Sequence, residues 1–143
     1  MHLLRIAEGV WTVLAVSDDE SNCAVLDLLA ENGAPGERML ADLQASVPER
    51  GPPRNSEASK PLRDKIFEFR EPVTKGGTLR VLWFYDEGKI VVCANGELKK
   101  TRKTSDSLIE AAIADRDRYL TDKRLGRLSI KDLPKPDQEE DIL

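Results

Sequence analysis

The prediction of the fold starts from the sequence LRVLWFYDEGKIVVCA, residues 79–94. Its two apolar runs are rich in β-branched and aromatic residues, and the polar segment between them contains a glycine, which is typical of a tight turn. We therefore predict a β-hairpin. Because side chains alternate along a strand, Arg80 and Phe84 should share one face of the first strand, while Trp83 lies on the other.

Outward from this hairpin, the pattern predicts one more strand before it and a helix after it. Residues 65–70 alternate between charged and apolar side chains, and Pro72 ends the run. A turn at residues 74–77 would connect this strand to the hairpin, giving three consecutive antiparallel strands. Beyond the hairpin, Ser105 or Asp106 can cap a helix. The apolar residues that recur at helical spacing in it are Leu108, Ile109, Ala112, Ile113 and Leu120.

The first part of the chain predicts a strand followed by two helices. Residues 10–16 are apolar and β-branched, as in a strand. Apolar residues at helical spacing then occupy 25–29 and 39–47, and Gly33 between them favours a helix end. The segment 48–60, rich in proline, glycine and serine, indicates a surface loop.

Together these elements predict an α+β fold with a small antiparallel sheet: a strand, two helices, a three-strand meander and a C-terminal helix. We expect the helices to group on one face of the sheet and to leave the other face open, or partly open, to solvent. The length of 143 residues suits a single domain. We assign residues 1–131 to it and interpret residues 132–143, which are acidic and contain prolines, as a flexible tail.

Charge is divided unevenly along the chain, although the net charge is only −4. Residues 1–59 carry a balance of −6, residues 60–131 a balance of +6, and the tail a balance of −4. The densest cationic segment is LKKTRKT, residues 98–104, which follows the hairpin directly. Such a cluster at the end of a strand is where a phosphate-bearing partner would bind.

Several kinds of chemistry are disfavoured. Cys23 and Cys93 are far apart and lack metal-ligand spacing, so we expect reduced, structural cysteines and neither a metal nor a cofactor. The only histidine, His2, lies in a terminus that we expect to be frayed, which excludes a histidine-pair ribonuclease mechanism. No apolar stretch suits a membrane helix and the start lacks a signal-peptide layout, so we expect a cytoplasmic protein with no membrane partner.

Four segments of the chain, taken in order, resemble the RelE/HigB toxin superfamily, and most closely its phage-derived, Gp49-like branch of HigB-type toxins. These are FEFR (67–70), LRVLWFY (79–85), IVV (90–92) and KKTRKT (99–104), and the resemblance covers about residues 8–122. It implies a RelE-like fold and the toxin of a type II toxin–antitoxin system. Such a toxin is a ribosome-dependent mRNA endonuclease, or mRNA interferase, that inhibits translation. The implied partners are mRNA on the ribosome and a helix-turn-helix, HigA-like antitoxin.

The resemblance and the residue pattern together give the candidate site. The cationic positions of the family fall on Arg70, Arg80, Lys99, Lys100 and Lys103. The candidate catalytic residues are Arg80, Arg70 and Lys99. The candidate RNA-binding residues are Lys100, Arg102, Lys103, Lys75 and Tyr119. RNA cleavage by its own 2′-hydroxyl needs cations on the phosphate, and arginine can hold two phosphate oxygens while staying charged.

The same residues have other interpretations. Arg70 and Arg80 could be structural partners of nearby glutamates such as Glu68, which could alternatively act as a base. Tyr119 could merely anchor its helix, and the lysine-rich segment could be a solvated turn. The whole chain could be a catalytically inactive relative that binds RNA or an antitoxin, or a phage-derived interaction protein with no RNA role. The acidic tail could fold over the basic face and reduce activity. Codon preference and oligomeric state do not follow from the sequence.

Overall fold

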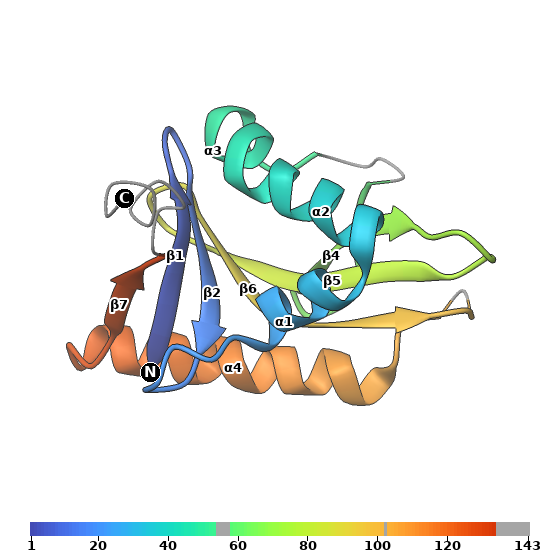
Figure 1. Cartoon of the computed structure of the whole chain (residues 1–143). Coiled ribbons are helices and arrows are strands. Elements are labelled where there is room, and N and C mark those ends of the chain that lie inside the picture. Colours follow the sequence, from blue (N-terminus) through green and yellow to red (C-terminus); the bar gives the residue numbers. More distant parts are fainter. Residues whose placement is uncertain (54–57, 102, 134–143) are drawn as a thin grey trace, which may run out of the picture.

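Seven strands of the described part of the chain form one sheet at the centre of the molecule (Figure 1). The computed structural model describes residues 1–53, 58–101 and 103–133. The order of the strands across the sheet is β3-β4-β5-β6-β2-β1-β7. Their bounds are β1 His2–Glu8, β2 Thr12–Ser17, β3 Ser59–Pro61, β4 Phe67–Pro72, β5 Thr78–Asp86, β6 Ile90–Lys99 and β7 Ser129–Asp132.

The predicted hairpin is present, together with the strand before it. β5 pairs antiparallel with β6, and β4 pairs antiparallel with β5 so that Arg70 lies directly opposite Arg80. The register of β5 and β6 shifts between Leu82 and Trp83, where Ala94 is the extra residue of a β-bulge. The three-strand meander is therefore confirmed.

The sheet is larger than predicted, and it is mixed. β6 pairs with β2 in parallel, β2 with β1 antiparallel, and β1 with β7 in parallel. The mixed α+β class holds, but the prediction of a small, wholly antiparallel sheet is wrong. The additional strands carry weak signals, because β3 has three residues, β7 has four, and Arg5 interrupts the apolar run of β1. His2 is part of β1 and does not lie in a frayed terminus.

Helices cover both faces of the sheet (Figure 1). On one side lie α1 (Ala24–Glu31), α2 (Gly33–Ala41), the π-helical segment η1 (Asp42–Ser46) and α3 (Val47–Arg50). The long helix α4 (Asp106–Arg124) lies on the other side. β5 requires this arrangement because it is apolar on both faces. The prediction of an open sheet face is therefore wrong.

A separate apolar core fills each side of the sheet. Leu79, Val81 and Trp83 of β5 belong to the core beneath α1, α2 and α3. Leu82 and Phe84 belong to the core beneath α4. This division confirms the alternation predicted for the strand, and it places Arg80 on the α4 side.

The helices α1 and α2 approach each other closely at Gly36. A Cβ atom added to Gly36 would lie 1.8 Å from the carbonyl oxygen of Leu29 and 2.8 Å from its carbonyl carbon. The helical corner that covers the sheet therefore depends on the missing side chain at this position.

The helix α4 begins at the predicted position. Ser105 is its N-cap residue, and the carbonyl oxygen of Ser105 accepts hydrogen bonds from two backbone N–H groups of the first turn. Ile109, Ala112 and Tyr119 bury the face that contacts the sheet. Leu120, predicted to belong to this stripe, is exposed. Among the described helices, α4 included, none is long and apolar enough to cross a membrane.

The predicted tail is described only at its start. Asp132 is the last residue of β7, and the backbone N–H of Leu133 donates to the carbonyl oxygen of Arg5 at 3.3 Å. Residues 134–143 of the predicted tail lie outside the described residues.

Candidate functional site

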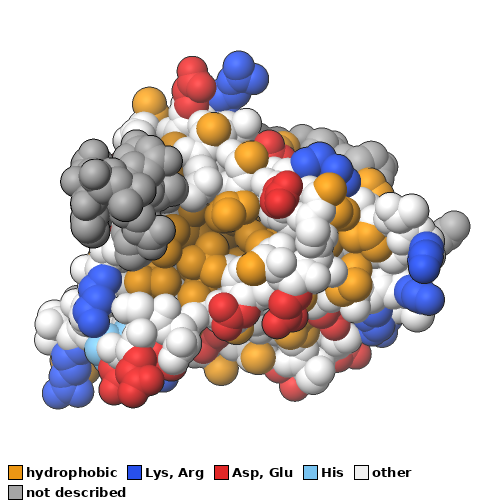
Figure 2. Space-filling view, in the orientation of Figure 1, with side chains coloured by type: hydrophobic (Ala, Val, Ile, Leu, Met, Phe, Trp, Pro, Cys, Tyr) orange, Lys and Arg blue, Asp and Glu red, His pale blue; other side chains and the backbone are white. Residues whose placement is uncertain are grey.

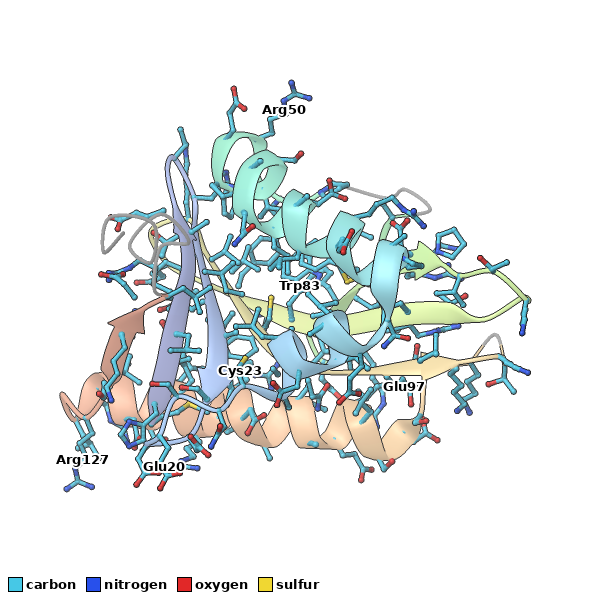
Figure 3. The ribbon with its side chains drawn as sticks, viewed as in Figure 1. Glu20, Cys23, Arg50, Trp83, Glu97 and Arg127 are labelled. Carbon is cyan, nitrogen blue, oxygen red and sulfur yellow. The ribbon has the colours of Figure 1, made fainter. Side chains whose placement is uncertain are left out.

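A row of polar residues crosses the α4 face of the sheet. Arg70 lies opposite Arg80 in the β4–β5 pair, and Arg80 lies opposite Glu97 in the β5–β6 pair. Directly opposite residues project to the same face of a sheet, and so does Glu68, two residues before Arg70 in β4. Glu97 belongs to β6 and lies beside the first turn of α4 (Figure 3). The strands thus bring two of the predicted catalytic arginines together beside the start of α4.

A groove of about 550 Å³ opens beside this row. It is bordered by the edge strand β3 on one side and by the turn from β6 to α4 on the other. Its lining consists of Lys60, Pro61, Leu62, Glu68, Arg70, Arg80, Lys103 and Thr104. Four of these side chains are cations and one is an anion, so we name this hollow the cationic groove. Figure 2 shows further Lys and Arg side chains at the end of the molecule where the β4–β5 hairpin and β6 end.

Arg80 lines the cationic groove, but it is only 1% exposed. Its Nη1 donates to the hydroxyl of Thr104 at 2.6 Å and lies 3.5 Å from both carboxylate oxygens of Glu68. Its Nη2 donates to the carbonyl oxygen of Thr101 at 3.0 Å. Arg80 therefore does not lie on an open sheet face, because residues of the β6–α4 turn contact its guanidinium group. Arg80 instead holds this turn against the sheet.

Glu68 is the buried counter-ion of the two arginines. Its carboxylate accepts a hydrogen bond from the Thr104 hydroxyl at 2.6 Å and lies 3.7 Å from Nε of Arg70. Of the two interpretations of Glu68, the structure shows the pairing with arginine. One carboxylate is shared by two guanidinium groups, so these three residues carry an excess positive charge. The Arg70 side chain, 20% exposed, presents that charge to the cationic groove.

The lysines of the β6–α4 turn differ in how they are held. Nζ of Lys99 donates to the hydroxyl of Ser105 at 2.9 Å, which orients this half-buried side chain at the end of the polar row. Lys100 is exposed, and so is Lys103, which lines the cationic groove. The predicted residue Arg102 lies outside the described residues.

Three predicted RNA-binding residues, Lys75, Lys100 and Tyr119, are not among the described residues that line the cationic groove. The predicted catalytic residue Lys99 is not among them either. Lys75 is exposed in the turn between β4 and β5, where its φ is +78°. Tyr119 is buried, its ring packs edge-on against Phe84, and its hydroxyl donates to Asp86 at 2.6 Å. Of the two interpretations of Tyr119, the structure shows the helix anchor, because this buried side chain holds α4 against the sheet.

Tyr119, Asp86 and Lys123 form a cluster that fixes the C-terminal half of α4. Nζ of Lys123 lies 2.9 Å from the Asp86 carboxylate. Burial raises the pKa of Asp86, but the hydrogen bonds from Tyr119 and Lys123 outweigh it, so the net pKa is below its ordinary value. Burial and the hydrogen bond to Asp86 raise the pKa of Tyr119, which keeps its hydroxyl protonated and donating.

Two polar residues of the cationic groove, Lys60 and Thr104, were not predicted as site residues from the sequence. Lys60, assigned to a loop, lies in β3 directly opposite Glu68. The available signal was Pro61, because proline within a sheet is confined to edge strands and strand ends. Thr104 is buried between Arg80 and Glu68. Nothing in the local sequence distinguishes it from a solvated turn residue.

The cysteines lie in the core. Cys23 and Cys93 are both buried and unpaired as free thiols, and burial raises the pKa of each. Within residues 1–53, 58–101 and 103–133, no three His, Cys, Asp or Glu side chains gather in a way that could hold a metal ion.

The fold and the groove define a small mixed α+β protein with a cationic hollow at the edge of its sheet. The family model described as phage derived protein Gp49-like (DUF891) matches residues 27–117, which extend from α1 into α4 and include the whole cationic groove. The chain therefore belongs to the phage-derived Gp49-like family. This membership suggests a toxin-like or phage-associated module. No curated protein and no solved structure matches the chain.

Proposed function

We propose that this chain is the toxin of a type II toxin–antitoxin pair, which binds mRNA on the ribosome and cleaves it. One observation carries the proposal: the described residues that line the cationic groove include four cations and one carboxylate, and that carboxylate is buried between two arginines. A half-enclosed excess of positive charge is neutralised by a polyanion, and RNA supplies one negative charge per nucleotide.

Arg70, rather than Arg80, is the arginine that can contact a phosphate. The Arg70 side chain is partly exposed, and its buried Nε has no hydrogen-bond partner within the part of the chain that the structure describes. Its planar guanidinium can hold two phosphate oxygens. Arg80 is enclosed and acts as a positioning residue that fixes Glu68 and the β6–α4 turn. Lys60 and Lys103, at opposite sides of the groove, would bind the neighbouring phosphates.

The proposed reaction is a transesterification within the RNA. The 2′-oxygen forms a bond to phosphorus, the bond from phosphorus to the 5′-oxygen breaks, and the products end in a 2′,3′-cyclic phosphate and a 5′-hydroxyl. The 2′-hydroxyl loses a proton to a base, and the leaving 5′-oxygen gains one. Lys99, oriented by Ser105, is the candidate for proton transfer, and Arg70 would stabilise the charge of the phosphorane.

A second candidate is a catalytically inactive relative that binds RNA or a helix-turn-helix antitoxin without cutting. The burial of Arg80 and Tyr119 favours it, because two residues expected to contact RNA are enclosed in the protein. Under this alternative the cationic groove would still bind RNA, with an affinity that falls as salt is added.

Purified ribosomes carrying a defined mRNA separate the two candidates. Cleavage by the parent protein, lost in Arg70→Ala and Lys99→Ala but kept in Arg118→Ala, would support the enzyme. Arg118 is an exposed residue of α4 and serves as the matched control. Salt-sensitive binding without cleavage would support the inactive relative. Neither binding nor cleavage would contradict both candidates.

A further inference from the structure

A second hollow lies on the other side of the edge strand β3. Its volume is about 320 Å³. It is lined by Pro53, Ser59, Lys60, Pro61, Phe67, Trp83 and Tyr85, and we name it the aromatic pocket. Lys60 and Pro61 also line the cationic groove, so the two hollows meet at β3. A chain bound in the groove could therefore place one of its groups in the aromatic pocket.

The aromatic rings of this pocket hold one another in place. Trp83 stacks against Phe67 and Phe69, with ring centroids 4.8 and 4.9 Å apart. Tyr85 meets Trp83 edge-on at 4.6 Å and is 38% exposed. A flat ligand would thus find an aromatic ring that is fixed by its neighbours and open to solvent.

The indole N–H of Trp83 is a buried donor that a ligand with a hydrogen-bond acceptor would satisfy. Trp83 is fully buried between the sheet and the helical layer (Figure 3), and its Nε1 has no hydrogen-bond partner among the described residues. Buried indole N–H groups ordinarily find a partner, and an unpaired one is destabilising. Trp83 lines the aromatic pocket, and a ligand acceptor atom that reached Nε1 from there would satisfy this donor.

We propose that the aromatic pocket binds one nucleobase of the RNA whose backbone lies in the cationic groove, an inference that rests on the proposed function. The base would stack on Tyr85, and its carbonyl oxygen would accept the indole N–H of Trp83. Lys60, which is shared by the two hollows, would bind the phosphate between them. The pocket volume lies near the lower end of small-ligand sites, about 300 Å³, which suits one base. Uracil, cytosine and guanine carry such a carbonyl oxygen, whereas adenine does not.

Proline-rich peptides also dock on aromatic grooves, but the charge favours RNA. Among the described residues that line it, the aromatic pocket has one cation, Lys60, and no acidic side chain, and the adjoining cationic groove has four cations and one carboxylate. RNA phosphates would complement this positive charge, whereas a neutral proline-rich segment carries no charge that does so. We therefore favour RNA as the occupant of the aromatic pocket.

The indole N–H resonance of Trp83 tests the proposal in the full chain. Trp11→Phe leaves Trp83 as the only source of an indole signal, since the chain has 2 tryptophans. We expect single-stranded hexauridylate to move this resonance and to bind more tightly than hexaadenylate. Tyr85→Ala should weaken binding roughly 5- to 150-fold, as expected for the loss of one stacked base, without changing its salt dependence. Val10→Ala, at an exposed apolar residue that does not line the pocket, should leave the affinity unchanged.

A second variant separates the hydrogen bond from the stacking. Trp83→Phe keeps an aromatic ring and removes the donor, so it should abolish the preference for hexauridylate. If hexauridylate binds with salt dependence while the Trp83 resonance and the Tyr85→Ala affinity stay unchanged, the base site is wrong and the proposed function stands. If neither oligonucleotide binds, the proposed function fails and the base site fails with it. If decaproline moves the resonance and hexauridylate does not, the occupant is a peptide and the proposal is overturned.

Discussion

Replacing Arg80 by methionine should strongly destabilise the fold, because Arg80 acts through buried contacts. The substitution keeps an unbranched side chain and removes the guanidinium group. It deletes the 2.6 Å hydrogen bond to Thr104, the 3.0 Å hydrogen bond to the carbonyl of Thr101 and the 3.5 Å contact with Glu68. Glu68 then keeps the Thr104 hydroxyl and the more distant Arg70, 3.7 Å away.

The expected loss in the free energy of unfolding is about 3 kcal/mol. Breaking a buried ion pair by removing one partner costs about 3–5 kcal/mol, because the remaining charge is buried without compensation. Arg70 can take over part of the interaction with Glu68, which places the estimate at the lower end. Small domains have unfolding free energies of about 5–15 kcal/mol, so this is a large share of the total. The double variant Arg80→Met/Glu68→Leu should recover about half of the loss or more, since apolar replacement of both partners is often neutral.

Urea unfolding at neutral pH, followed by circular dichroism, measures these differences. Arg118→Met makes the same chemical change at an exposed position of α4 and should shift the unfolding free energy by no more than about 0.5 kcal/mol. If Arg80→Met proved as stable as Arg118→Met, the buried network would not hold the β6–α4 turn, and the reasoning would be refuted.

Three other substitutions have defined outcomes. Tyr119→Phe removes the hydroxyl that donates to Asp86 and should cost about 1–2 kcal/mol in urea unfolding; an unchanged midpoint would contradict the anchoring role. The pKa of Asp86 is lowered in the folded state, so its stabilisation is present at neutral pH and is lost as the pH falls through that lowered value. In Asp86→Asn, the free energy of unfolding should therefore fall less steeply below roughly pH 4 than in the parent protein. An equally steep fall in both proteins would contradict this role of Asp86. Gly36→Ala would place a Cβ atom 1.8 Å from the Leu29 carbonyl oxygen and should lower the thermal midpoint by at least about 8 °C, whereas a shift under about 2 °C would show that the α1–α2 contact can relax.

The central meander follows from the sequence because its signals are local. Residues 79–94 contain two β-rich runs and the turn between them, and no distant segment is needed to recognise the hairpin. The parallel pairing of β2 with β6 depends on segments about eighty residues apart, so no local pattern specifies it. The sequence of β5 did indicate that helices cover the second face of the sheet. β5 is apolar on nearly every position, and such a run is typical of a strand buried on both faces.

The candidate site was predictable in its location and not in the state of each side chain. The exposed lysines Lys100 and Lys103 follow from a polar turn between a strand and an N-cap. The burial of Arg80 does not follow from the local sequence. It depends on contacts with Glu68 and Thr104, which are 36 residues apart in the chain and meet only after folding. The role of Tyr119 is equally hard to predict from the sequence, since a tyrosine on a helix can either anchor the helix or stack on a base.

The salt dependence of RNA binding tests most directly whether the cationic groove receives an RNA backbone. Fluorescence anisotropy of a labelled single-stranded RNA, measured across a series of potassium chloride concentrations, gives the slope of log affinity against log salt. Two triple variants are compared: a groove variant with Lys60→Ala, Arg70→Ala and Lys103→Ala, and a control variant that removes three exposed cations elsewhere, Lys89→Ala, Arg118→Ala and Arg127→Ala. We predict that the slope falls in magnitude by about 2 in the groove variant, at roughly 0.7 per lost phosphate contact, and stays at the parent value in the control. Equal slopes in the two variants, or no salt-dependent binding by the parent protein, would contradict the assignment of RNA to this groove.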